Sequence, residues 1–113
     1  MGIDFTHCDA SWSYGNFHRA RVRLAETIGI KMDEMLGFGG NQEWNAAVSP
    51  LVILLDHSDC DGELSPDECR LVAPALRKAV EPWPDGDSDK RRFLELANGM
   101  DAAAEANEPL EFT

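Results

Sequence analysis

The chain has 113 residues, which is enough for one domain with its own hydrophobic core and too few for two. Hydrophobic residues make up 43% of the chain, so a globular fold is expected rather than wholesale disorder. The 21 acidic residues against 10 lysines and arginines give a formal charge of −11, which disfavours direct binding to nucleic acid or to an anionic membrane and favours cations or basic protein surfaces.

Most of the chain has helical periodicity. Helices are expected at 16–28, 31–36, 41–48, 51–55, from Ser65 to the prolines at 82 and 84, and at 89–106. Short extended segments are expected near the ends, at 3–5 and 110–112, where apolar and acidic residues alternate. We therefore predict a single domain over residues 1–113, all-α, with about four to five short helices and short extended termini.

A five-residue apolar run at 51–55 precedes the most informative segment. Ser49 and Pro50 are good residues for the start of a helix, because proline at the first helical position loses no hydrogen bond. A buried strand is the rival interpretation of this run, since periodicity does not separate the two over five residues.

The segment that follows, DHSDCDGELSPDE over residues 56–68, resembles the calcium-binding loop of the EF-hand family. Its pattern is D-x-[DN]-x-[DN]-G-x5-E, and Gly62 matches the glycine that allows the sharp turn. The resemblance covers a helix–loop–helix at about 49–82 and implies a set of oxygen ligands for a calcium-class cation. These are the carboxylates of Asp56, Asp59, Asp61 and Glu68, the backbone carbonyl of Glu63, and Ser65 through a water.

The first loop position departs from the pattern. Alignment on Gly62 puts His57 there, whereas the apolar residues Leu51, Val52 and Leu55 of the preceding run fit a loop that starts at Asp56. A one-residue insertion reconciles the two, so Asp56 is predicted as first ligand of a thirteen-residue variant loop, with His57 on its rim or as an alternative ligand.

Two other interpretations of this region stay open. Ser65, Pro66 and Glu68 form a capping box, which needs no metal. His57 and Cys60, with His7 and Cys8, would suit zinc, although no CxxC pair is present. EF-hands usually pair through a short strand at the eighth loop position, which Leu64 occupies here. Leu64 is therefore expected to pair with the segment at 3–5 or with a second copy in a homodimer.

The three cysteines have irregular spacing and do not indicate a disulfide framework, and residues 1–10 do not resemble a signal peptide. A cytoplasmic protein without a membrane span is therefore expected.

The leading hypothesis is a small acidic protein that binds a divalent cation, most naturally Ca²⁺, for structure or regulation. The alternative is an acidic interaction or inhibitor protein, a nucleic-acid mimic that engages a basic partner and binds no metal. No nucleophile–base or phosphate-loop motif supports an enzyme. The mimic would present the acids at 85, 87, 89, 95, 101, 105 and 108 outward along one face.

Overall fold

A computed structural model describes residues 2–45, 47–57 and 62–113. Two of the predicted ligands, Asp59 and Asp61, lie outside the described residues. The elements in chain order are β1 (Gly2–Asp4), β2 (Ser11–Ser13), α1 (Tyr14–Glu26), the 3₁₀ turn η1 (Met32–Glu34), α2 (Leu51–Leu55), β3 (Glu63–Leu64), α3 (Pro66–Val80), α4 (Ser88–Glu105) and β4 (Leu110–Glu111).

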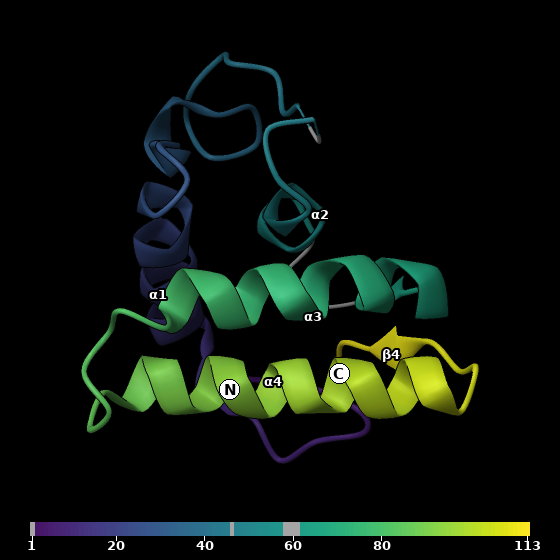
Figure 1. The fold of residues 1–113 in the computed structure, drawn as a ribbon. Helices are drawn as coiled ribbons and strands as arrows, with labels where there is room; N and C mark the ends of the chain where they lie inside the picture. The colour runs from purple at the N-terminus through teal and green to yellow at the C-terminus, as the bar shows by residue number, and fades with distance from the viewer. Residues whose placement is uncertain (1, 46, 58–61) are drawn as a thin grey trace.

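The helices form the bulk of the domain. Figure 1 shows α3 and α4 side by side as an antiparallel hairpin, with α2 on the side of α3 that faces away from α4 and with α1 running across the layers. Side-chain caps fix the starts of three of them: Ser13 caps α1, Ser65 caps α3 and Asp87 caps α4. The capping box predicted at Ser65 and Glu68 is confirmed.

The expectation of an all-α fold is wrong. Besides the helices, the described residues contain two small antiparallel sheets: β1 pairs with β2, and β3 pairs with β4. Alternation indicated extended segments at 3–5 and 110–112, close to β1 and β4, but the strands are only two or three residues long. All four have their partner across a loop or far along the chain, so local sequence does not reveal the sheets. The fold is therefore mixed and mostly helical.

The two chain ends meet beside the candidate loop. An isolated bridge joins Phe5 to Phe112, and the backbone N–H of Thr6 donates to Glu111 O at 3.0 Å. Leu64 pairs with Leu110 of β4, and the segment at 3–5 pairs mainly with β2. The predicted pairing of Leu64 with 3–5 is thus wrong, because the C-terminal strand lies between them.

The core is a single cluster to which every helix contributes, and the aromatic rings of Phe5, Trp12, Phe17 and Phe93 pack against one another inside it. No helix among the described residues is both long and apolar enough to cross a bilayer. The helix expected at 41–48 is absent from the described part of that segment.

Candidate functional site

The helix before the loop has the orientation that the Asp56 register requires. Leu51, Val52 and Leu55 are buried, whereas Asp56 is exposed at the C-cap of α2. The run at 51–55 is therefore a short helix, not a strand, and it delivers Asp56 to the solvent-facing start of the loop.

A buried arginine closes the end of this helix. Arg21, only 2% exposed, donates from Nη1 to the carbonyl oxygens of Leu54 at 3.3 Å, Leu55 at 3.2 Å and His57 at 2.6 Å. The last carbonyls of a helix have no intrahelical hydrogen-bond donor and carry partial negative charge. A guanidinium there donates hydrogen bonds to these carbonyls and also offsets their charge. The sequence analysis did not single out Arg21 as part of the site. The signal was available, because Arg21 follows the core residue Phe17 by four positions on α1 and so shares its face.

His57 contacts Phe112 and the backbone of Glu63. Its ring stacks on Phe112, with centroids 4.0 Å apart and planes at 23°, and its Nε2 lies 3.1 Å from Glu63 O. Because a carbonyl oxygen only accepts, this hydrogen bond requires the proton on Nε2. The Nε2 atom is therefore engaged with the carbonyl that was predicted as a cation ligand.

Gly62 makes the turn that its place in the motif predicts. Its φ is +95°, and a Cβ there would lie 2.9 Å from Cε1 of His57. Only glycine adopts this backbone conformation without strain, and here it also admits the imidazole. The next residue but one, Leu64, sits fully buried in the β3–β4 ladder.

The end of the loop is held by the capping box. Ser65 Oγ accepts the Glu68 N–H at 3.1 Å, and Glu68 Oε1 accepts the Ser65 N–H at 2.9 Å. A bidentate contact from Glu68 to a cation would have to share or replace this second hydrogen bond. Two of the predicted ligand oxygens, Glu63 O and Glu68 Oε1, thus already have donors within the chain.

Asp56 lies at the edge of an open cavity of about 440 Å³ that also borders Arg21, His57, His18 and Phe38. Partial desolvation raises the pKa of Asp56, while the nearby positive charge of Arg21 and the imidazole of His57 act in the opposite direction. The lining of this cavity therefore combines the exposed carboxylate of Asp56 with the buried guanidinium of Arg21.

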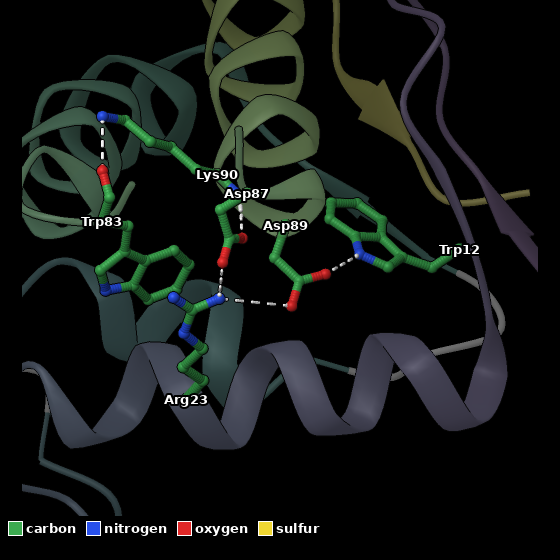
Figure 2. Close-up of polar contacts among 6 residues, drawn as sticks. All are labelled: Trp12, Arg23, Trp83, Asp87, Asp89 and Lys90. Carbon is green, nitrogen blue, oxygen red and sulfur yellow. Dashed lines mark hydrogen bonds and ion pairs between the residues drawn. The ribbon is translucent and has the colours of Figure 1, made fainter. Parts of the chain in front are cut away.

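Several of the acidic residues that the mimic hypothesis places on one face form ion pairs with basic side chains of the same chain. Arg23 Nη1 lies 2.7 Å from Asp87 Oδ2 and 3.7 Å from Asp89 Oδ2, and its guanidinium lies 3.8 Å from the ring centroid of Trp83 (Figure 2). Trp12 Nε1 donates to the same Asp89 at 3.3 Å. This cluster ties α1 to the start of α4, so these carboxylates serve to join helices and are not arrayed outward.

Ion pairs also engage three further acids that the mimic hypothesis requires: Asp85 with Lys90, Asp101 with Arg77, and Glu108 with His7. Five of the seven carboxylates thus lie within ion-pair distance of a base. Asp87 and Asp89 are the less exposed members of this set, whereas Asp85, Asp101 and Glu108 keep more than half of their side chains exposed.

Within the described ranges, no three histidine, cysteine or acidic side chains are placed to hold a metal ion together. The zinc hypothesis gains no support there, since His57 contacts Phe112 and His7 contacts Thr6 and Glu108. Comparison of the chain with protein-family models, with curated protein sequences and with solved structures found no match. The EF-hand resemblance therefore rests on the sequence of the loop alone.

Proposed function

We propose that the protein binds a divalent cation, calcium before magnesium, through residues 56–68, for a structural or regulatory purpose and without catalysis. The observation that supports this best is the order of local geometries across the described parts of the segment. A short helix ends at Asp56, Gly62 has a left-handed φ, Leu64 lies in a ladder, and Ser65 caps the next helix. This is the order in which an EF-hand loop uses its first, sixth, eighth and ninth positions.

In this proposal Asp56, Asp59, Asp61 and Glu68 supply carboxylate oxygens, Glu63 supplies its carbonyl, and Ser65 holds a water. Calcium accepts six to eight oxygens in flexible geometry, whereas magnesium demands a strict octahedron, so a loop with an inserted residue suits calcium better. We also propose a cytoplasmic location, which the irregular cysteine spacing supports, with Cys8 and Cys69 present as free thiols.

A bound cation would share or replace two contacts inside the loop. These are the hydrogen bonds from the His57 N–H to Glu63 O and from the Ser65 N–H to Glu68 Oε1, at 3.1 and 2.9 Å. His57→Ala removes one competitor and is expected to tighten calcium binding, whereas Asp56→Ala removes a charged ligand and is expected to weaken it.

The test is calcium titration by calorimetry, together with melting curves in millimolar calcium and in excess chelator. A ligand that binds only the folded state stabilises it by mass action, so calcium should raise the melting temperature. Glu68→Gln should abolish most of the heat, and Glu63→Gln is the matched control, because it makes the same charge change but leaves the ligating carbonyl in place. An unchanged melting temperature, or equal losses in the two variants, would overturn the proposal.

A further inference from the structure

A groove lies away from the loop, where the end of α1, the start of α2 and the second half of α3 meet. Its volume is about 700 Å³, and its apolar lining includes Ile28, Leu51, Ala75, Ala79 and Trp83. Val48, on the rim, has 54% of its surface exposed. A concave, mostly apolar site of this size is in the range of small-molecule pockets.

The groove carries a single positive charge. Among the described residues that line it, Lys78 is the only charged one, and within the described part of the chain no carboxylate lies within ion-pair distance of its amine. Its neighbour Arg77, in contrast, pairs with Asp101 at 2.6 Å. In a chain of net charge −11, an unpaired lysine beside exposed apolar surface is a local complement for an anionic head group.

One wall of the groove is fixed in place. The guanidinium of Arg23 lies over the Trp83 ring at 3.8 Å and is itself held by Asp87 at 2.7 Å, as Figure 2 shows. Pro82, next to Trp83, also lines the groove. A wall that is already ordered loses little entropy when a ligand binds, so the site is preorganised.

We propose that this groove binds a small amphiphilic anion, with its apolar body against α3 and Trp83 and its carboxylate or equivalent head group at Lys78. A second copy of the chain is a poor occupant, because it brings the same net charge of −11. The proposal does not depend on the cation site, since none of the loop residues 56–68 lines the groove.

The probes are octanoate, 1-octanol and octylammonium, each titrated into the ¹⁵N-labelled full chain in excess chelator. Octanoate should give saturable shifts of the Trp83 indole N–H and of the Ala75 and Ala79 amides, and it should bind more tightly than octylammonium. Lys78→Gln should weaken octanoate binding about two- to fivefold, the range of an exposed ion pair, and leave octanol unchanged. Arg91→Gln, the same charge change at an exposed site on α4, should leave both unchanged.

Ala79→Leu fills the groove and should weaken all three probes; Ala75→Val serves the same purpose if the leucine variant does not fold. The proposal is overturned if octanoate gives no saturable shift, if the shifts lie elsewhere, or if Lys78→Gln behaves as Arg91→Gln does. Shifts of the groove resonances that depend on protein concentration without any probe would also overturn it, since they would mean that a second copy occupies the groove.

Discussion

The geometry of the loop can be tested without any ligand by substituting Gly62. Gly62→Ala adds a Cβ at a position with φ of +95°, 2.9 Å from Cε1 of His57. Two separate costs result: a strained backbone and a displaced imidazole. Each can be given a magnitude from the contacts in the structure.

The backbone cost is about 1–2 kcal/mol, the penalty of an L-residue in the left-handed region. Any movement of the imidazole away from the added Cβ disturbs a contact. Its ring centroid lies 4.0 Å from that of Phe112, and its Nε2 donates a hydrogen bond to Glu63 O at 3.1 Å. Disturbing an aromatic stack costs about 0.5–1.5 kcal/mol and losing a hydrogen bond about 1 kcal/mol. With partial relaxation, Gly62→Ala should lower the free energy of unfolding by about 3 kcal/mol.

The assay is urea denaturation, with two glycines of the same chain as matched controls. Gly29 has φ of +76° but nothing within 4 Å of an added Cβ, so Gly29→Ala measures the backbone term alone, about 1 kcal/mol. Gly86 has neither feature, so Gly86→Ala should be neutral or slightly stabilising. If Gly62→Ala costs no more than Gly29→Ala, His57 is not held in the loop and the reasoning is refuted.

Three further outcomes follow from the packing. Asp87→Ala should lower the free energy of unfolding by about 1 kcal/mol at pH 7, because the Asp87 carboxylate caps α4. The hydrogen bond from the Lys90 backbone N–H, and then Arg23, lower the pKa of Asp87, so its stabilising contribution is complete above the ordinary aspartate pKa and is lost as the pH falls through the lowered pKa. Unfolding curves of both proteins at pH 7 and pH 3 measure this loss. Gly99→Ala should destabilise despite its better helix propensity, since the added Cβ would lie 2.7 Å from Cβ and 2.9 Å from Sγ of Cys8. Cys8→Ala should rescue it only in part, because the Cβ contact remains, and full rescue in urea denaturation would contradict the Cβ contact. Deletion of 110–113 should lower stability and expose the edge of β3, and an unchanged urea midpoint would show that β4 contributes nothing.

The sequence predicts the helices best where local signals are strong. Ser65 with Glu68 identifies the start of α3, and the helix expected at 89–106 is found one residue earlier at both ends, as Ser88–Glu105 with Asp87 as its cap. The start of α1 was placed too late, at Asn16, because the hydroxyl of Ser13 takes the capping role and accepts the Asn16 N–H. Both residues are good caps, and their local sequence does not separate them.

The remaining errors concern contacts between distant segments. The tail at 110–112 was expected to be extended, but its pairing with β3 depends on a register between two-residue strands, which no local pattern encodes. The role of Arg21 was overlooked because a charged side chain can be buried on an apolar face only where other segments supply hydrogen-bond acceptors. Here the acceptors are carbonyl oxygens at the end of α2, more than thirty residues later in the chain. Propensity and periodicity describe one element at a time, so they do not report such contacts.

The candidate loop is best understood as a unit that the rest of the chain completes. Leu64 has its strand partner in Leu110, so a second copy is not needed to fill the ladder. His57 and Arg21 supply donors to oxygens at the two sides of the turn, at Glu63 O and at the end of α2. A cation in the loop therefore has to share Glu63 O with the His57 N–H or displace it, whereas Arg21 donates to carbonyls outside the predicted ligand set. Substitution of His57 should consequently change cation affinity by removing a competing donor, and a substitution of Arg21 should act through the end of α2.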